Sequence, residues 1–279
     1  MIKHLFRSAI AALVVLGLIS TAAGSAFADT LDDVKERGVV RIGVKADYRP
    51  WGFRDPSGKI IGMEIDLAQD VANRLGVDLK TVPVVGSNRM QFLQQGKIDI
   101  IIATMSDTEK RRKVIGIVHP NYYSSGTNVM ANKKYGLKKW EDLRGRTVCG
   151  LQGSWYNKKV SKKYGAKFIA FKGNPEIHTA LKQDQCVGYV YDDSAIGSWL
   201  ADKDKWGDFE MPLQTEDDTP WGIAVRLDER TTAFGAFMSG VIYDWHETGK
   251  LIELEKKWGI KPTAYLKTMH AKHKDFLAE

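Results

Sequence analysis

The sequence contains few of the residues and motifs on which metal sites and hydrolytic enzymes depend. Only two cysteines, Cys149 and Cys186, occur among 279 residues, and they are too far apart for the ligand spacing of a zinc site. No G-x-S-x-G, H-E-x-x-H or phosphate-binding glycine loop is present, so the usual motifs of serine hydrolases, zinc proteases and P-loop enzymes are missing. We therefore expect neither a metal nor a cofactor.

Long apolar runs are also scarce, and the longest lies near the N-terminus. Residues 9–19 are apolar, a stretch too short to span a bilayer comfortably. Lys3 and Arg7 precede this run, which leads through small residues to Ala26-Phe27-Ala28. This order is typical of a secretory signal peptide. We expect export with cleavage after Ala28, and a retained membrane anchor is the alternative.

Charge of one sign is not in large excess either. Residues 1–28 carry two basic and no acidic residues, so cleavage leaves 39 basic and 34 acidic residues and a net charge of +5. The basic residues do not form the aromatic-interleaved pattern of a nucleic-acid groove, and we expect no nucleic-acid partner. An apolar content of 43% is normal for a globular protein, and 279 residues suffice for one large domain or two ordinary ones.

Residues 96–113 change character abruptly in the middle. Residues 98–103 form a short, nearly unbroken apolar run rich in β-branched side chains, which is typical of a strand buried on both faces of a parallel sheet. Ser106 followed three residues later by Glu109 has the spacing of a capping box, so a helix is expected to begin near Asp107. A strand therefore leads directly into the N-terminus of a helix.

Such a junction can bind an anion. Unpaired backbone N–H groups at a helix N-terminus attract negative charge, and Thr104, Ser106 and Thr108 add hydroxyl groups. Arg111, one turn into the helix, can offer a planar fork to a carboxylate. We interpret the stretch as a small carboxylate site. The alternative is that Ser106 only caps the helix and that residues 111–113 form a solvated basic face.

This stretch resembles the ligand loop of a known family, the polar-amino-acid family of periplasmic solute-binding proteins, which deliver substrates to ABC importers. The resemblance rests on hydroxyl residues at positions 104, 106 and 108 followed by Arg111. It extends from about Leu31 to Trp258 and includes Gly-Met-Glu-Ile-Asp-Leu at 62–67 and Asn-Arg at 88–89. It implies an α/β, type II periplasmic-binding-protein-like fold, in which two α/β lobes are joined by two hinge crossings.

The resemblance also implies how the chain is divided. The second lobe would interrupt the first, so that a ligand is clamped between strand ends of both. We expect a monomer whose closed form docks on the membrane permease of an ABC importer. The expected segments are a signal peptide (1–28), the first part of lobe 1 (29–130), lobe 2 (131–218), the return to lobe 1 with closing helices (219–259) and a C-terminal extension (260–279).

The family site implies roles for charged residues on both lobes. Arg111, the Ser106 hydroxyl and loop N–H groups would hold the α-carboxylate of an amino acid. Asp192, at the end of a second-lobe strand, would hold the α-ammonium group. A second strand-to-helix junction contains Ser154 and Trp155, and Trp155 is bulkier than the hydroxyl residue usual there. The complete predicted ligand-binding set is Lys45, Tyr48, Trp51, Arg89, Thr104, Met105, Ser106, Arg111, Ser154, Trp155 and Asp192.

Selectivity for the ligand side chain would depend on the first lobe. Tyr48 and Trp51 match family positions whose rings pack against the ligand, with a place in the core as the alternative. Lys45 and Arg89 match positions that face the ligand side chain, and two cations there disfavour a cationic ligand. We expect an acidic or neutral polar amino acid in preference to arginine or lysine. The neutral choice stays open because Asp47 could neutralise Lys45.

The resemblance also bears on the cysteines and on catalysis. Cys149 and Cys186 fall in second-lobe strands that could be neighbours, and some family members carry cysteines at similar places. We therefore predict a disulfide between them, with two small buried apolar residues as the alternative. The scaffold also resembles periplasmic dehydratases, which need a general acid. Glu64 and Asp193 do not match that pattern, so we expect a binding protein and keep the enzyme as the alternative.

Overall fold

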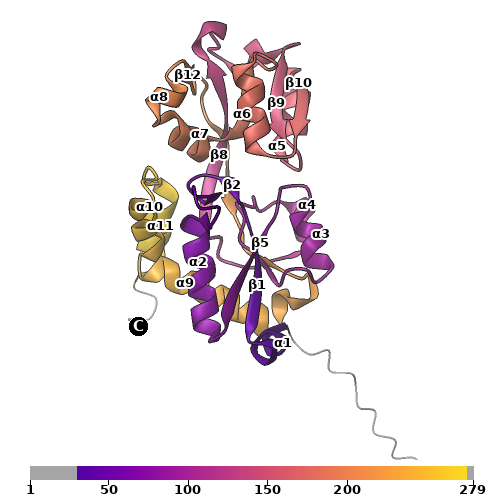
Figure 1. The fold of residues 1–279 in the computed structure, drawn as a ribbon, viewed down its shortest axis with the longest axis vertical. Helices are drawn as coiled ribbons and strands as arrows, with labels where there is room; N and C mark the ends of the chain where they lie inside the picture. Colours follow the sequence, from indigo (N-terminus) through magenta and orange to yellow (C-terminus); the bar gives the residue numbers. More distant parts are fainter. Residues whose placement is uncertain (1–29, 275–279) are drawn as a thin grey trace, which may run out of the picture.

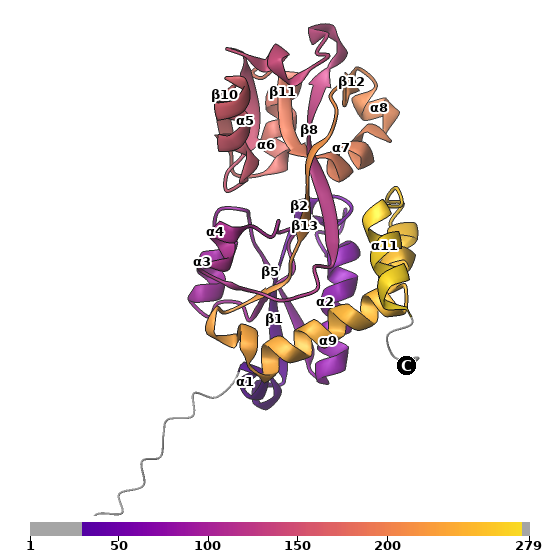
Figure 2. The same ribbon diagram turned by 180° about the vertical axis from the view of Figure 1, so that it is seen from behind.

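The structure, a computed structural model, describes residues 30–274. The predicted signal peptide and its cleavage site lie outside the described residues, as do residues 275–279. Figure 1 shows two α/β lobes arranged along the long axis, and Figure 2 shows from behind the two chain segments that join them. The expected two-lobed α/β fold is therefore confirmed.

Lobe 1 is built on a mixed five-stranded sheet of order β5-β1-β6-β14-β7. β1 (Val39–Val44) runs parallel to β5 (Asp78–Pro83) and to β6 (Ile100–Ile101). β14 (Ala224–Val225) returns from lobe 2 and pairs antiparallel with β6 and with β7 (Gly116–Ile117). The sheet is thus completed by two stretches of chain that are far apart in the sequence.

Helices cover both faces of this sheet (Figures 1 and 2). In α2, Leu67 and Val71 lie one turn apart and are both buried, and Gly76 ends the helix with a positive φ of 70°. The remaining elements of lobe 1 are α1 (Thr30–Arg37), β2 (Asp47–Tyr48), β3 (Gly52–Arg54), β4 (Ile60–Ile61), α2 (Met63–Leu75), α3 (Arg89–Gln94), α4 (Glu109–Arg112), η3 (Asp228–Thr231), α9 (Ala233–Glu247), α10 (Lys250–Lys257) and α11 (Ala264–His273).

Lobe 2 contains a six-stranded sheet of order β10-β9-β11-β8-β12, in which β13 also pairs with β8. β9 runs parallel to β10 and β11, whereas β8 is antiparallel to β11. The elements of this lobe are β8 (Tyr123–Asn132), η1 (Lys133–Tyr135), η2 (Trp140–Leu143), β9 (Thr147–Leu151), α5 (Tyr156–Tyr164), β10 (Lys167–Phe171), α6 (Asn174–Lys182), β11 (Gly188–Asp192), α7 (Asp193–Leu200), α8 (Lys203–Trp206), β12 (Phe209–Glu210) and β13 (Glu216–Trp221).

The two segments that cross between the lobes are β8 and β13 (Figure 2). They pair antiparallel, with Tyr123 opposite Trp221 and Thr127 opposite Glu216. Since both crossings belong to one ladder, a single two-stranded ribbon links the lobes. A narrow link of this kind is suited to a hinge, because a few residues can absorb the rotation of one lobe against the other.

The C-terminal extension is part of lobe 1. Its helix α11 packs against α9 and α10, and the Tyr265 hydroxyl donates a hydrogen bond to the Asn121 carbonyl at 2.9 Å. His270 Nδ1 lies 2.7 Å from the His246 carbonyl of α9. The extension therefore supports the base of the first crossing, which begins just after Asn121.

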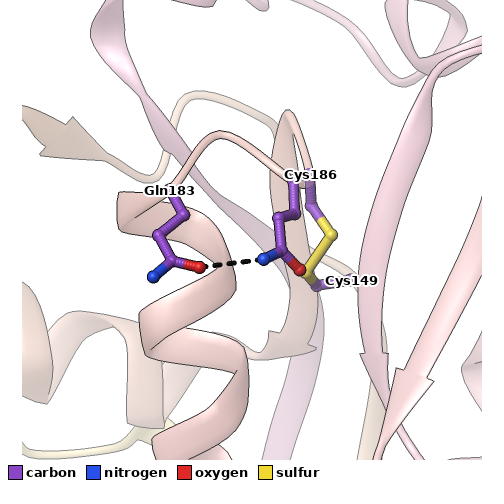
Figure 3. The surroundings of a disulfide bond; sticks show 4 residues. Cys149, Gln183 and Cys186 are labelled. Carbon is purple, nitrogen blue, oxygen red and sulfur yellow. Dashed lines mark hydrogen bonds between the residues drawn. A yellow bond between two sulfur atoms is a disulfide. The ribbon is translucent and has the colours of Figure 1, made fainter.

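Cys149 and Cys186 form a disulfide within lobe 2 (Figure 3). Cys149 belongs to β9, and Cys186 lies just before the neighbouring strand β11, so their Cα atoms are 5.5 Å apart. Both residues are buried. The predicted pairing is confirmed, although Cys186 precedes its strand and does not belong to it.

We predict that removing the disulfide destabilises lobe 2 and leaves the cleft between the lobes intact. The bond closes a loop of 37 residues, and chain-entropy arguments assign such a loop about 4 kcal/mol of stability. Urea unfolding of Cys149→Ser/Cys186→Ser should show a loss of about 2–4 kcal/mol. Oxidised wild type is the control, and an unchanged unfolding midpoint would contradict the prediction.

Candidate functional site

A small cavity lies between the two lobes and is bounded by the ends of strands from both. Its volume is about 20 Å³, room for about one water molecule, so the lobes are closed on each other. The residues that line it are Lys45, Gly86, Arg89, Thr104, Ser106, Arg111, Leu151, Gly153, Ser154, Trp155, Tyr156, Tyr191 and Asp192. The cavity combines three cations with one carboxylate.

Arg111 spans the gap between the lobes. Its guanidinium donates to the Ser106 carbonyl at 2.6 Å within lobe 1 and to the Gly153 carbonyl at 3.1 Å on lobe 2. Burial, with the nearby charge of Arg89, lowers the pKa of Arg111 to about 9, so the side chain stays charged at neutral pH. A buried cation with two carbonyl partners retains donors for an anion.

The predicted capping role of Ser106 is wrong. α4 begins only at Glu109, and its N-cap is Thr108, whose hydroxyl accepts from the Arg111 N–H at 3.4 Å. Ser106 is held elsewhere, in a bridge with Trp221 of β13. The helix has only four residues, so it presents little dipole to an anion. Arg111 is therefore the main source of positive charge in this loop.

Trp155 approaches the same loop from lobe 2. Its indole Nε1 donates to the Ser106 hydroxyl oxygen at 3.1 Å. The bulky residue therefore supplies a hydrogen-bond donor where a hydroxyl residue was expected. This contact links the strand-to-helix junction of lobe 2, which contains Ser154 and Trp155, to the junction of lobe 1, which contains Ser106.

Asp192 brings a carboxylate to the cavity from the end of β11. Its Oδ2 accepts from the Tyr48 hydroxyl of lobe 1 at 2.7 Å. Asp192 occupies the N-cap position of α7 but makes no side-chain cap bond, so its oxygens are available to the cleft. Burial raises the pKa of Asp192 to about 7, whereas the Tyr48 hydrogen bond and the charges of Arg89 and Arg111 oppose the rise.

Lys45, which is buried, and Asp47, which is partly exposed, form an ion pair at the cavity. Their Nζ and Oδ1 atoms are 2.8 Å apart, and the lysine is 1% exposed. The contact lacks hydrogen-bond alignment, and neither atom has a hydrogen-bond partner among the described residues. Asp47 also reaches lobe 2, where its Oδ2 accepts from the Asn174 N–H at 3.0 Å. Asp47 therefore balances the charge of Lys45, while the N–H groups of the lysine ammonium remain able to donate hydrogen bonds to a ligand.

The structure brings most, but not all, of the predicted residues to the cavity. Tyr48 touches Asp192 without lining the cavity. Trp51 packs edge-on against Tyr123 and Trp221 at the base of the hinge, and Met105 lies in the core of lobe 1. Their contact with a ligand stays a prediction. The cavity-lining residues from the predicted set are Lys45, Arg89, Thr104, Ser106, Arg111, Ser154, Trp155 and Asp192.

Sequence reasoning missed two tyrosines that line the cavity. Tyr156 follows Trp155 and Tyr191 precedes Asp192, so both are direct neighbours of predicted residues. Both are buried. Their adjacency to Trp155 and Asp192 was the available signal for a place in the cavity. Neighbouring side chains of a strand normally face opposite sides, so the position of Asp192 alone does not predict that Tyr191 also lines the cavity. Gly86, Leu151 and Gly153 were also missed.

A larger groove of about 940 Å³ lies on the other side of the crossing strands. Gly197 of α7 and Ala201 at its C-terminal end line it together with Ile260 and with Tyr265 of α11. None of the predicted ligand-binding residues lines this groove. The interlobe cavity, which Arg111 and Asp192 line from opposite lobes, is therefore the candidate site.

The described part of the chain, residues 30–274, has neither a helix able to span a membrane nor a metal-binding cluster. No helix in this part of the chain has the length and apolarity that crossing a membrane requires. Across the same residues, no group of three or more His, Cys, Asp or Glu side chains is placed to hold a metal ion.

Comparison with known proteins agrees with this geometry. The model of the bacterial extracellular solute-binding proteins, family 3, matches residues 40–261. The ABC transporter glutamine-binding protein GlnH of Bacillus subtilis is 31% identical over 236 residues, covering 82% of this chain and 84% of the relative. The glutamate/aspartate import solute-binding protein of Salmonella typhimurium is 22% identical over 276 residues, covering 92% and 89%.

A solved structure shows the same architecture. The P235GK mutant of ArgBP from T. maritima superposes with a TM-score of 0.76 at 32% identity. The match covers 82% of this chain and 98% of that chain. The relatives named here are thus similar over most of their lengths, although their names refer to different ligands.

We predict that Asp192 makes the stability of the unliganded protein fall as the pH rises. Its pKa in the folded state, about 7, lies above the ordinary 3.8, so between these values the folded protein holds a proton that the unfolded chain has released. The stabilising contribution is present below about pH 4 and is lost as the pH rises through about 7.

Urea unfolding at about pH 5 and about pH 8 checks this prediction, with Asp192→Asn as the comparison because asparagine resembles the neutral acid. The wild type should lose about 1 kcal/mol or more beyond the loss of the variant. Equal losses in both proteins would contradict the prediction.

Proposed function

Because this chain belongs to the bacterial extracellular solute-binding proteins, family 3, we propose that it captures a polar amino acid and delivers it to the permease of an ABC importer. One observation carries the proposal: Arg111 and Asp192, of opposite charge and on opposite lobes, line a single interlobe cavity. An α-amino acid is a zwitterion that can bind both.

The proposed binding mode uses both charges at once. Arg111 holds the α-carboxylate together with the Ser106 hydroxyl, and Asp192 holds the α-ammonium group in exchange for part of its contact with Tyr48. Each charge-assisted hydrogen bond contributes about 1.5–3 kcal/mol. Since these bonds need both lobes, the ligand favours the closed arrangement of the hinge.

The enzyme alternative is not supported. The family is one of solute-binding proteins, so the prediction that the chain is not an enzyme is confirmed. Of the two acids considered, Glu64 is wholly buried and Asp193 accepts from the Ser125 hydroxyl and the Gly126 N–H. Neither acid lines the cavity, so neither meets a substrate there as a general acid.

We propose that the ligand is acidic or neutral rather than cationic. Lys45 and Arg89 line the cavity next to Arg111, and a like-charge contact at about 4 Å with an effective dielectric of about 20 is unfavourable by about 4 kcal/mol. Asp47 balances Lys45 at 2.8 Å, which keeps neutral side chains such as that of glutamine in range. The names of the relatives refer to glutamine, to glutamate or aspartate, and to arginine. The proposed preference therefore rests on the charges in the cavity and not on these names.

Other parts of the proposal concern where and how the protein works. We propose export with cleavage after Ala28 into the periplasm, and action as a monomer that docks on the membrane permease. Neither a cofactor nor nucleic acid takes part. The family's extracellular setting supports export.

We predict that Arg111→Ala loses amino-acid binding while the fold persists, because the main positive charge for the α-carboxylate is gone. Calorimetry should show at least about a 100-fold weaker affinity. Arg112→Ala is the matched control, since Arg112 follows on the same helix but is exposed and pairs with Asp107 at 2.6 Å. The control should stay within about threefold of wild type, and wild-type affinity in Arg111→Ala would contradict the binding mode.

We also predict the order of ligands. Thermal-shift and calorimetric titrations with glutamate, glutamine and arginine should raise the melting temperature for the first two, since a ligand stabilises the state that binds it. Arginine should bind at least about tenfold more weakly than the better of them. Tight arginine binding would mean that Lys45 and Arg89 do not repel the ligand side chain.

A further inference from the structure

We propose that Glu64 and Arg89 are positioning residues that clamp one peptide unit, the one between Ala103 and Thr104, and thereby fix the shape of the carboxylate-binding loop. The clamp itself is independent of any ligand, whereas its effect on affinity depends on the proposed function. In this view Arg89 shapes the loop in addition to lining the cavity.

The contacts place a carboxyl oxygen at one polar end of that peptide and a guanidinium at the other. Glu64 Oε1 accepts from the Thr104 N–H at 2.7 Å, and Arg89 Nη1 donates to the Ala103 carbonyl. The N–H and the carbonyl belong to the same peptide group. Glu64 is 0% exposed and Arg89 6% exposed. Burial raises the pKa of Glu64 to about 7, and the guanidinium of Arg89 is the charged partner, whose hydrogen bond is about twice as strong as a neutral one.

The clamped peptide leads into a strained residue. Thr104 has a φ of +44°, in the left-handed region that a β-branched side chain rarely adopts. Asp184 and Asp217 are the other non-glycine residues with positive φ in the part of the chain that the structure describes, and aspartate tolerates this conformation better than threonine. The backbone at Thr104 therefore needs support from outside the loop.

This left-handed turn determines which residues reach the cavity. β6 ends at Ile101, and the loop that follows places Met105 in the core while Thr104, Ser106 and Arg111 line the cavity. If Thr104 relaxed to an ordinary strand conformation, the residues after it would be redirected. The clamp thus acts on the ligand through the loop, not by touching it.

Glu64 also joins the loop to the hinge. The Tyr122 hydroxyl donates to the same Oε1 atom, and Tyr122 directly precedes the crossing strand β8. Glu64 itself comes from the first turn of α2 and Arg89 from the first turn of α3. Helix α2, the ligand loop and the start of the hinge therefore meet at one carboxyl group, and α3 reaches the same loop through Arg89.

Amide hydrogen exchange on the full chain without ligand tests the clamp directly. In Glu64→Ala, the amides of residues 104–106 should exchange at least about tenfold faster than in wild type, while those of β9 in lobe 2 stay unchanged. Arg89→Met should also speed amide exchange at residues 104–106, and it replaces Glu64→Ala as the test if that variant does not fold. Glu64→Gln keeps an acceptor for the Thr104 N–H and should lie closer to wild type.

The matched control is Glu229→Ala. Glu229 is another buried carboxylate of lobe 1, 3% exposed, that accepts from the Thr30 N–H far from the cavity. It should lower the melting temperature without loosening residues 104–106. Unchanged exchange of these residues in both Glu64→Ala and Arg89→Met, or equal loosening in Glu229→Ala, would overturn the clamp.

A double-mutant cycle then tests the role of the strain in binding. Calorimetry with L-glutamate and L-glutamine should show that Glu64→Ala weakens binding by about 10–100-fold when Thr104 is present. In the Thr104→Gly background the same change should weaken binding by less than about threefold, because glycine adopts the left-handed conformation without strain. An equal loss in both backgrounds would overturn this role. If neither amino acid binds wild type while residues 104–106 loosen as expected, the proposed function fails and the clamp stands.

Discussion

Two buried charges of opposite sign, one on each lobe, are the constraint on which the arrangement of this protein depends. Arg111 is held by two backbone carbonyls and Asp192 by the Tyr48 hydroxyl. A buried ion with neutral partners alone carries an uncompensated desolvation penalty. Burial raises the pKa of Asp192 to about 7 and lowers that of Arg111 to about 9, so a zwitterion that gives each group a charged partner stabilises the ionised form of both.

Polar contacts hold the closed lobes together, and the ring of Tyr48 also packs against those of Tyr191 and Trp199 on lobe 2. Besides the bonds of Arg111 and Asp192, Asp47 accepts from the Asn174 N–H, and Trp155 donates to Ser106. Such bonds can be exchanged for bonds to water when the lobes part, so opening changes their net free energy little. The balance between open and closed forms is therefore sensitive to the additional bonds that a bound molecule supplies.

Features with a local signal were predictable from the sequence. The two-lobed fold, the disulfide, and the placement of Arg111 and Asp192 at one cavity followed from short motifs and their resemblance to a family. The helix cap was mispredicted for a physical reason: Ser106 has the right spacing to Glu109, but Trp155, 49 residues away, binds its hydroxyl.

Contacts between distant segments left no such signal. The bond from Thr104 to Glu64 joins residues 40 apart, and that from Tyr48 to Asp192 joins residues 144 apart. Periodicity reports on neighbours along one element, and it cannot reveal which side chain from another element meets a given backbone group. The possible neutralisation of Lys45 by Asp47 was by contrast recognised from the sequence, because the two residues are only two positions apart.

The indole of Trp155 gives the molecule an optical property. It sits on lobe 2 and donates to Ser106 on lobe 1, whereas the indoles of Trp140, Trp245 and Trp258 bond to groups of their own lobes. If the lobes part, the Trp155 ring loses this acceptor, and we expect its emission to change with the angle between the lobes. The chain thus carries a built-in fluorescent reporter of its own hinge, which responds to closure whatever the chemical nature of the molecule that causes it.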